Sequence, residues 1–414
     1  MRICPTTKPA RGKMALVICA VGVLLAVSSE SAAKPLSPKA LFARMESSSP
    51  VIQELNAQLE FARLEFRRAA VILQPSLSYS NEQLTTSAGT DRESAIGVSN
   101  DISFLWSRPS RVRAAQYSLQ AAEAEYLQSN SEFQSEVIIG CLRLNLLKLE
   151  LTLIDSVANQ VEFLVRSAQG RAKAGELSDY QAERFRLEQT EILRLRQELL
   201  SGERELLINL ISLTGLPETD LRNGDVAVGD LPRLSPDSTV ALALASNARL
   251  KMMQAREQAM RSSVTAASTG SLPKMELGVG RRTSTGGGKG AVVELSASFD
   301  LLGQRGGEIR RAKAAWKAAE TERLAYEQQI ALETKSLIEQ LSHLPASDVR
   351  PGAESAINSN ALRILYAQGE LSASELVDML KATIDSQKAQ NSLLVLKIEL
   401  ELQLRRLCGR GIIE

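Results

Sequence analysis

Two hydrophobic patterns along this chain predict two kinds of element. Between 110 and 172, apolar residues recur at three- and four-residue spacing without a proline, which predicts one very long helix. Partial alternation of apolar and polar residues predicts strands at 75–86, 94–106, 273–283 and 291–302. A helix of about 60 residues reaches about 90 Å at 1.5 Å per residue. That length suits a coiled coil or a helical barrel better than a globular core.

The pattern occurs twice. The letters LSP stand at 36–38 and again at 234–236, 198 residues later, and GELS stands at 175–178 and at 369–372, 194 residues apart. Such steady offsets indicate an internal repeat. Between the copies, a stretch rich in Gly, Pro and Asp is typical of a linker.

Each copy has the same predicted plan: a helix, a β-hairpin, a long helix, a GELS corner and a returning helix. The first helices are expected at about 37–72 and 235–268, and the returning helices at 179–212 and 373–407. Prolines within 342–352 interrupt the long helix of the second copy. The predicted segments are a signal peptide at 1–33, a first repeat at 34–215, a linker at 216–234, a second repeat at 235–408 and a tail at 409–414. The first repeat has its hairpin at 75–106 and its tip at 175–178. The second has its hairpin at 273–302 and its tip at 369–372.

The N-terminus has the three parts of a secretory signal. Basic residues precede the apolar stretch 14–27, and the small residues at 31–33 offer a cleavage site after Ala33. A retained anchor helix is the alternative. A lipoprotein is disfavoured because Cys19 lies inside the apolar stretch and follows Ile18, where processing requires a small residue.

Each GELS corner predicts a tight reversal between two helices. Gly175 and Gly369 can adopt the left-handed conformation that ends a helix. Ser178 and Ser372 can cap the next helix, with Gln or Glu three residues further to complete a capping box. A helical hairpin alone explains this pattern. Two similar tips in one chain also suggest a repeated docking point.

Composition and residue chemistry exclude several functions. The 49 basic and 48 acidic residues leave a net charge of +1, unlike the basic surplus of nucleic-acid binders. The single histidine, His343, belongs to no metal-ligand pattern, and GGGKG at 286–290 is interpreted as a hairpin turn. We therefore expect no enzyme activity, no cofactor and no metal site. A disulfide between Cys141 and Cys408 is a minor hypothesis beside two buried thiols.

Signal, repeat and element order together resemble the TolC-type outer-membrane efflux proteins over nearly all of the mature chain. The stretches that carry the resemblance are ESSSPVIQ (46–53), LQPSLSYS (73–80), ISFLWSRPSRVRAAQ (102–116), RAKAGELSDYQAERFRLEQ (171–189) and LINLISLTGLPE (207–218). A further run, DLLGQRGGEIRRAKA (300–314), weakly resembles the heavy-metal efflux branch of that family.

The resemblance implies a mainly α fold with a small β part. Long antiparallel helical hairpins would form a periplasmic α-barrel, and four strands per chain would contribute to a trimeric 12-stranded β-barrel in outer-membrane lipid. The protein would be the duct of a tripartite efflux system. It would meet a periplasmic adaptor (membrane fusion) protein at its tips and, through it, an inner-membrane pump. The implied docking residues are Gly175, Leu177, Ser178, Asp179, Gly369, Leu371 and Ser372.

Two other functions remain open at this stage. The chain could be the outer-membrane duct of a type I protein secretion system, which would have the same fold and tips. It could also be a periplasmic coiled-coil scaffold without a pore, because the strands are polar and poor in aromatic residues compared with membrane barrels.

Overall fold

The computed structural model describes residues 38–71, 74–87, 89–222, 235–270, 272–298, 304–344 and 372–409. The chain divides into Met1–Lys34 and Pro35–Glu414, and every described residue belongs to the second unit. The predicted signal peptide, Gly369, Leu371, linker residues 223–234 and most of the tail lie outside the described residues.

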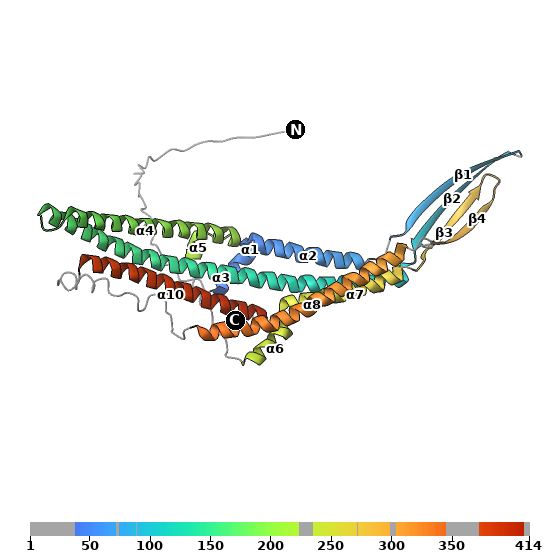
Figure 1. Cartoon of the computed structure of the whole chain (residues 1–414). Helices are drawn as coiled ribbons and strands as arrows, with labels where there is room; N and C mark the ends of the chain where they lie inside the picture. The colour runs from blue at the N-terminus through green and yellow to red at the C-terminus, as the bar shows by residue number, and fades with distance from the viewer. Residues whose placement is uncertain are drawn as a thin grey trace, which may run out of the picture. The chain divides into compact units, whose positions relative to one another are not determined.

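The first repeat contains six helices or strands and one short extra helix (Figure 1). They are α1 (Pro38–Ser48), α2 (Pro50–Ala70), β1 (Ser76–Thr86), β2 (Gly89–Asp101), α3 (Phe104–Lys173), α4 (Asp179–Thr214) and the short α5 (Glu218–Arg222). The long helix α3 runs in one piece past Pro109, its sixth residue, which has no N–H to donate to the Leu105 carbonyl.

The second repeat has the same order of elements. They are α6 (Pro236–Ser246), α7 (Ala248–Gly270), β3 (Lys274–Ser284), β4 (Lys289–Ser298), α8 (Gln304–His343) and α10 (Ala373–Leu407). The proline-rich stretch that the sequence places inside the second long helix follows the end of α8 and is mostly outside the described residues.

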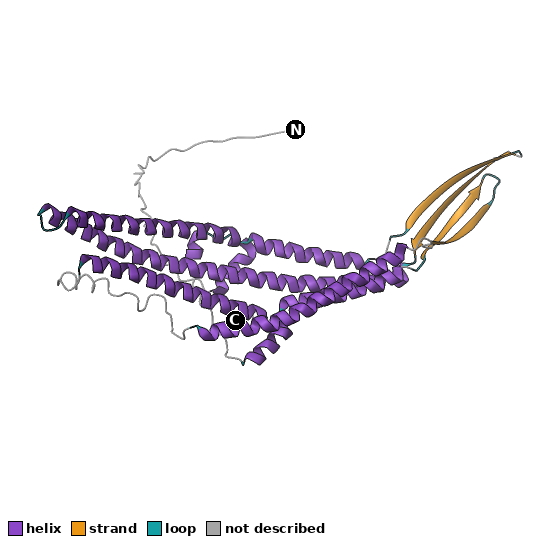
Figure 2. Cartoon of the chain, viewed as in Figure 1, coloured by secondary structure: helices purple, strands orange, loops and turns teal. Residues whose placement is uncertain are grey.

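The four strands form one antiparallel sheet in the order β1-β2-β3-β4 (Figure 2). The two predicted hairpins are therefore present, and β2 and β3 join them. In that middle pair Gly97 lies opposite Gly280. A Cβ on Gly280 would lie 2.6 Å from the carbonyl oxygen of Ile96, so the close contact between the repeats requires a residue without a side chain here.

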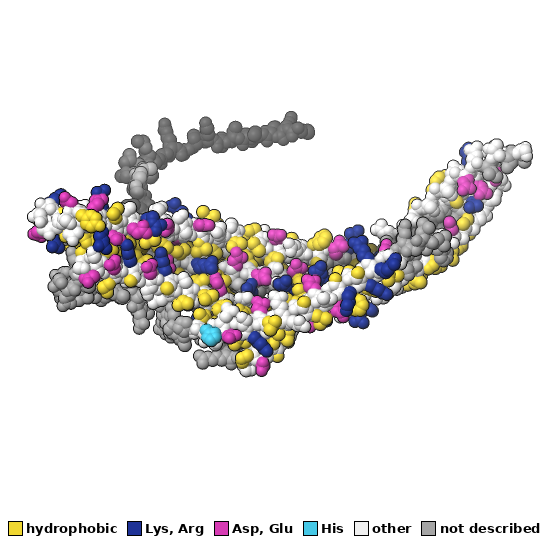
Figure 3. All heavy atoms as spheres, viewed as in Figure 1, with side chains coloured by type: hydrophobic (Ala, Val, Ile, Leu, Met, Phe, Trp, Pro, Cys, Tyr) yellow, Lys and Arg dark blue, Asp and Glu magenta, His cyan; other side chains and the backbone are white. Residues whose placement is uncertain are grey.

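All four helix–strand junctions lie at one end of this sheet. Ser76 pairs with Ser99, and Lys274 pairs with Ser298, so the start or end of each strand meets there. Arg108, near the start of α3, donates two hydrogen bonds to the carbonyl oxygen of Ala70 at the end of α2, at 2.9 and 3.1 Å. Figure 3 shows Lys and Arg side chains gathered where the helices meet the strands.

The first helix of each repeat is divided in two, which differs from the unbroken helices that the sequence predicts. The break in the first repeat is at Ser49, whose extended backbone is followed by Pro50, and whose hydroxyl accepts a hydrogen bond from the Ile52 amide. In the second repeat Asn247 takes the same place, and its Oδ1 accepts from the Leu250 amide at 2.8 Å. Both residues act as N-caps that start a new helix.

The break allows the first repeat to hold the end of its returning helix, a contact that we call the first clasp. The Ser48 hydroxyl donates to the carbonyl oxygen of Thr214 at 2.9 Å, and the Ser49 hydroxyl donates to that of Leu213 at 2.7 Å. These bonds satisfy carbonyls that the end of α4 leaves without partners. Gly215 follows at φ +66°, and a Cβ there would lie 2.3 Å from the Ser48 carbonyl oxygen.

The second repeat contains an equivalent second clasp. The Ser246 hydroxyl donates to the carbonyl oxygen of Cys408, and the Asn247 side-chain amide donates to that of Leu407 at 3.2 Å. Gly409 has φ +60°, and a Cβ on it would lie 2.3 Å from the Ser246 carbonyl oxygen. The same joint is thus built twice, and of the side-chain donors only the N-cap differs: Ser49 in the first repeat and Asn247 in the second.

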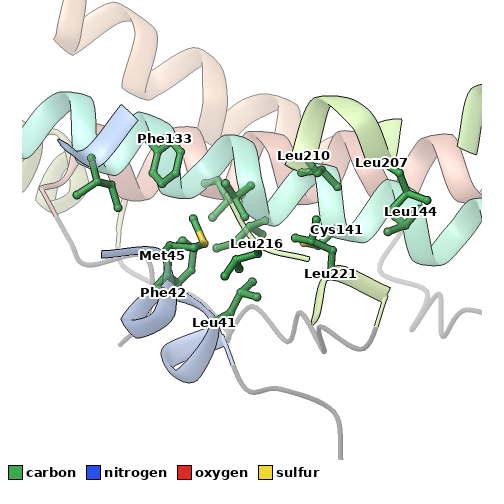
Figure 4. Packing of buried hydrophobic residues seen from close by; sticks show 14 residues of the cluster. Leu41, Phe42, Met45, Phe133, Cys141, Leu144, Leu207, Leu210, Leu216 and Leu221 are labelled. Carbon is green, nitrogen blue, oxygen red and sulfur yellow. The ribbon is translucent and has the colours of Figure 1, made fainter. Parts of the chain in front are cut away.

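The hydrophobic core consists of separate clusters along the helices. Around the first clasp, α1, α3, α4 and α5 pack together through Leu41, Leu144, Leu210 and Leu221, which are almost completely buried (Figure 4). A Cβ on Gly140 of α3 would lie 2.6 Å from a methyl carbon of Leu210, so α3 and α4 approach closely at this point. A second cluster lies near the tips, and a third surrounds the second clasp.

The two described cysteines are buried in different clusters and are not joined by a disulfide, so the disulfide hypothesis is wrong. Burial raises the pKa of the Cys141 thiol to about 11. This thiol is a small apolar core group at neutral pH.

Both returning helices begin with the predicted capping box. Ser178 and Gln181 form it in α4, and Ser372 and Glu375 form it in α10. The Ser372 amide donates to Glu375 Oε2 at 2.8 Å. Hydrogen bonds from the side chain and then the backbone of Ser372 lower the pKa of Glu375 below its usual value.

We expect Gly215→Ala to lower the free energy of unfolding by at least about 1 kcal/mol, because alanine is strained at positive φ and its Cβ would meet the Ser48 carbonyl. Thermal unfolding followed by circular dichroism at 222 nm measures the change. The matched control is Gly202→Ala in α4, where nothing lies within 4 Å of the new Cβ and stability should rise by about 0.5–1 kcal/mol. Equal melting temperatures of the two variants would contradict the clasp.

The stability that the second capping box gives to the start of α10 should depend on pH, and that of the first capping box should not. Because the folded pKa of Glu375 is lowered, its contribution is complete above the ordinary value and is lost as pH falls through the lowered one. Hydrogen exchange at the start of α10 should therefore be faster in Glu375→Ala than in the native chain above pH 4.5, and this difference should vanish in stronger acid. In α4, the effect of Gln181→Ala should not change with pH. A pH-independent effect of Glu375→Ala would be the contrary result.

Candidate functional site

The tip of the first hairpin is a compact helix reversal. Gly175 has φ +77°. Its amide donates to the carbonyl oxygen of Ala172 at 3.0 Å, and the amide of Glu176 donates to that of Arg171 at 2.9 Å. This pair of bonds is the Schellman arrangement. It ends α3 and lets α4 return beside it (Figure 1).

The predicted docking residues of this tip fall into two groups. Gly175, Ser178 and Asp179 are exposed, whereas Leu177 is half-buried and packs against the apolar cluster behind the tip. Tyr180, which sequence reasoning did not select, has 81% of its surface exposed. An aromatic side chain this open beside an acid suits contact with another protein.

The second tip is described only from Ser372 onward, and its Ser372 is exposed. The next residue, Ala373, takes the place that Asp179 has in the first tip. Asp179 is open to solvent, but Ala373 is half-buried against the same cluster as Leu177. The two corners therefore present different surfaces at this point.

The start of α10 packs against the first helical hairpin, formed by α3 and α4. Its side chains Leu376, Val377, Leu380 and Ile384 are buried in a cluster with residues of α3 and α4. We call this the tip cluster; its buried members are Leu151, Ile154, Val157, Val161, Leu164, Val165, Ala168, Phe185, Ile192, Leu376, Val377, Leu380 and Ile384.

Polar contacts extend this attachment along the helices. Lys381 of α10 forms an ion pair with Glu188 of α4. Further along, the buried Asn391 donates to Glu150 of α3 at 2.6 Å and accepts from Gln387 at 2.9 Å. The second repeat thus packs on the first through α10 as well as through the sheet.

One face of α8 is open although the equivalent face of α3 is covered. On α3, the side chains of Tyr117, Ala121, Ala124 and Gln128 are buried or half-buried, and α3 is in extensive contact with α7. The positions 197 residues later on α8 are all exposed. They are Ala314, Ala318, Thr321 and Ala325. We call these four residues the α8 stripe.

Equivalent faces of α2 and α7 also differ in exposure. On α7, Ala259 and Ser262 are 3% and 8% exposed. Their equivalents on α2, 198 residues earlier, are Phe61 and Leu64, which are 65% and 52% exposed. These two side chains are large and apolar, whereas the α8 stripe is made of small residues. A groove of about 1160 Å³ between α2 and α3 adjoins Phe61.

The returning helices α4 and α10 also differ in the exposure of equivalent residues. Leu193 and Ile208 of α4 are exposed. Their equivalents in α10, 194 residues later, are Gln387 and Leu402, and both are buried. At these positions the second repeat is covered by the first, and the matching surface of the first repeat is uncovered.

The described residues hold no group of His, Cys, Asp and Glu side chains arranged to bind a metal ion. His343 lies exposed in the last turn of α8. In GGGKG, Gly286, Gly287 and Gly288 lie in the turn between β3 and β4, and Lys289 and Gly290 begin β4. Within the described part of the chain, every helix is too short or too polar to cross a membrane.

Sequence reasoning missed the clasps, Tyr180 and the open faces. The clasp residues do carry a signal, because Gly215 and Gly409 follow the returning helices at the same 194-residue offset as the tips. The open faces are visible only when the burial of equivalent residues is compared.

Solved structures of outer-membrane channels have the same fold. The outer membrane protein VceC of Vibrio cholerae matches with a TM-score of 0.72 and 16% identity, covering 91% of this chain and 97% of that one. The Campylobacter jejuni CmeC outer membrane channel matches with a TM-score of 0.72 and 14% identity, covering 90% and 85%. The open state of the Neisseria gonorrhoeae MtrE outer membrane channel matches with a TM-score of 0.66 and 13% identity, covering 91% and 90%.

No protein-family model matches the sequence, and no curated protein matches it. At identities of 13–16% the matches establish the fold. The resemblance to the heavy-metal branch stays a prediction. The chain has the fold of TolC-type outer-membrane channels, as its sequence predicted.

Proposed function

We propose that this protein is the outer-membrane channel of a tripartite efflux system, which passes substrates from an inner-membrane pump and a periplasmic adaptor to the exterior. The observation that carries the proposal is the fold match over about nine-tenths of the chain. The strands have 10 to 13 residues, and about 9–11 residues suffice for a tilted strand to cross a bilayer.

The channel is a ring of copies joined head to tail, and the open helix faces support this arrangement. Inside one chain, α3 packs on α7, with the hydroxyl oxygens of Ser110 and Thr269 only 3.3 Å apart. The equivalent contact with a second copy joins α8 to α2. A contact between two different surfaces generates a ring when the rotation closes.

The register of the internal contact indicates which residues meet between copies. The positions equivalent to Ser110 and Thr269 are Gly307 on α8 and Val71, directly after the end of α2. Because the two helices run antiparallel, Ala314 then faces Leu64 and Ala318 faces Phe61 of the second copy. Small side chains of the α8 stripe would lie opposite large exposed ones, and this complementarity favours close packing.

The sheet also requires further copies. One chain leaves β1 and β4 as edges, and lipid does not tolerate open edges because their backbone groups cannot pair with water. The fold match favours three copies, whose strands would form one shared barrel.

The exposed tips are the proposed docking points for the periplasmic adaptor. Asp179 and Tyr180 supply the open polar and aromatic surface of the first tip. Gly175 and Ser178 shape the turn, while Leu177 mainly holds it to the tip cluster. Ser372 marks the corresponding end of the second hairpin. A scaffold without a pore leaves the four-stranded sheet without a role. Among the described residues, no contact favours protein secretion over efflux.

Cysteines placed at the proposed contact should cross-link neighbouring copies. We expect Leu64→Cys with Ala314→Cys, in a chain whose Cys141 and Cys408 are replaced by alanine, to give covalent dimers and trimers on oxidation of outer membranes. Denaturing gel electrophoresis without reductant measures the yield. The control pairs Leu64→Cys with Ala315→Cys, whose side chain points to another side of α8 and which should cross-link far less. Equal yields from both pairs would refute the register.

Changes at the first tip should weaken adaptor binding without preventing assembly of the copies. Asp179→Arg together with Tyr180→Ala should weaken adaptor binding by at least about tenfold and reduce export, because both side chains are exposed and neither supports the core. Binding of the purified adaptor to the detergent-solubilised channel measures the first effect. Glu198→Arg, exposed in the middle of the same helix, is the control and should bind normally. Full binding by the tip variant would remove this tip from the docking site.

A further inference from the structure

A band of positive charge surrounds the base of the sheet. Four stretches meet there: 66–71, 104–115, 264–275 and 304–315. Among their described side chains nine are basic and one, Glu308, is acidic; Glu65, Asp101 and Glu276 adjoin these stretches, so basic residues still outnumber acids at this level. We call the nine the basic collar: Arg67, Arg68, Arg108, Arg111, Arg113, Lys274, Arg310, Arg311 and Lys313. The whole chain has a net charge of +1, so the collar is a local excess.

Little in the chain neutralises this charge. Arg68 has one ion pair, with Glu65 at 3.5 Å, and both side chains are largely exposed. The guanidinium of Arg108 is used on the Ala70 carbonyl. No other collar residue lies within 4 Å of a carboxylate among the described residues. Near the tips, by contrast, Arg166 and Arg171 are each paired with a nearby glutamate.

Most of the collar is open to solvent. Seven of the nine residues, all but Arg108 and Arg111, are exposed. Arg113 of α3 and Arg310 of α8 are equivalent positions and are exposed in both repeats. They therefore lie outside the internal α3–α7 contact and outside the equivalent contact between copies. Figure 3 shows the band on one face of the molecule, next to the strands.

The geometry points to a function for the basic collar: it binds the anionic headgroups of phospholipids, such as phosphatidylglycerol, in the leaflet that faces the periplasm. This inference rests on the proposed function, because a sheet that crosses the outer membrane places its base at that surface. Lys and Arg residues near an anionic leaflet attract it, and each changes the affinity about fivefold.

Assembly into a ring would strengthen the need for anions. In the register given above, Gly307 lies opposite Val71, so one turn along each helix brings Arg311 of one copy to Arg67 of the next. Like charges at such a contact repel each other. A phosphate group between them removes the repulsion and offers each guanidinium a bidentate partner.

The collar brings basic residues from both repeats to one level of the molecule. A ring of copies would continue it around the whole barrel. Such a band would fix how deeply the strands sit in the membrane.

The test uses the full mature chain in non-ionic detergent, where lipid binding does not depend on insertion. Phosphatidylglycerol and phosphatidylethanolamine with identical acyl chains are added at equal concentration, and native mass spectrometry counts the lipids retained. We expect the native chain to prefer phosphatidylglycerol. Arg113→Gln with Arg310→Gln and Lys313→Gln should reduce that preference at least tenfold, and 0.5 M salt should reduce it in the native chain.

The control removes three exposed basic residues away from the sheet: Lys173→Gln with Arg184→Gln and Arg204→Gln. It should keep the preference. Equal retention of both lipids by the native chain, or an equal loss in the control, would overturn the inference. Collar-dependent sedimentation with purified peptidoglycan, without a headgroup preference, would also overturn it and assign the collar to the cell wall.

Insertion is scored separately, as protection of the strands from protease in vesicles. A chain that inserts but shows no headgroup preference would contradict lipid binding by the collar and would still agree with the proposed channel function. A chain that binds phosphatidylglycerol through the collar but leaves its strands open to protease would support the collar and contradict the proposed function.

Discussion

The packing of α3 on α7 is the contact on which the rest of the structure depends. It joins the long helix of one repeat to the first main helix of the other, so the two surfaces differ. A contact of this kind uses one surface from each repeat and leaves one surface of each uncovered. Phe61 and Leu64 on α2 and the small residues on α8 are those uncovered surfaces. In the proposed channel, the single chain is one segment of a ring, and the uncovered surfaces of neighbouring copies meet.

The clasps explain how each repeat keeps its long hairpin attached. Broken first helices, capped by Ser49 and Asn247, place side-chain donors against the last carbonyls of α4 and α10. The glycine after each returning helix allows the close approach. The two repeats use Ser and Asn for the same task, and these residues are among the preferred N-caps. The offset changes from 198 to 194 residues between the two sides of the clasp, yet the joint is preserved.

Local signals in the sequence were sufficient for the repeat, the hairpins and the capped tips. Glycine at Gly175, serine at Ser178 and the capping glutamine act through neighbouring backbone, so their effect can be derived from residues close in sequence. The breaks at Ser49 and Asn247 were missed because the carbonyl groups that these side chains bind lie more than 150 residues away in the sequence.

Tertiary packing also decided the role of Leu177. It looks like a contact residue from sequence, but the tip cluster holds it, while Tyr180 is left open. The contrast between Asp179 and Ala373 was visible as a substitution, and the structure adds that Ala373 packs inward. Residues Gly369 and Leu371 lie outside the described part, so their docking role remains a prediction.

The most direct test of a head-to-tail ring is the mass of the protein extracted from purified outer membranes in mild detergent and measured by native mass spectrometry. The account predicts three copies of the mature chain, because open α2 and α8 faces and the β1 and β4 edges are satisfied only when a ring closes. A monomer or a two-fold dimer would contradict it, since either would leave complementary faces and sheet edges uncovered.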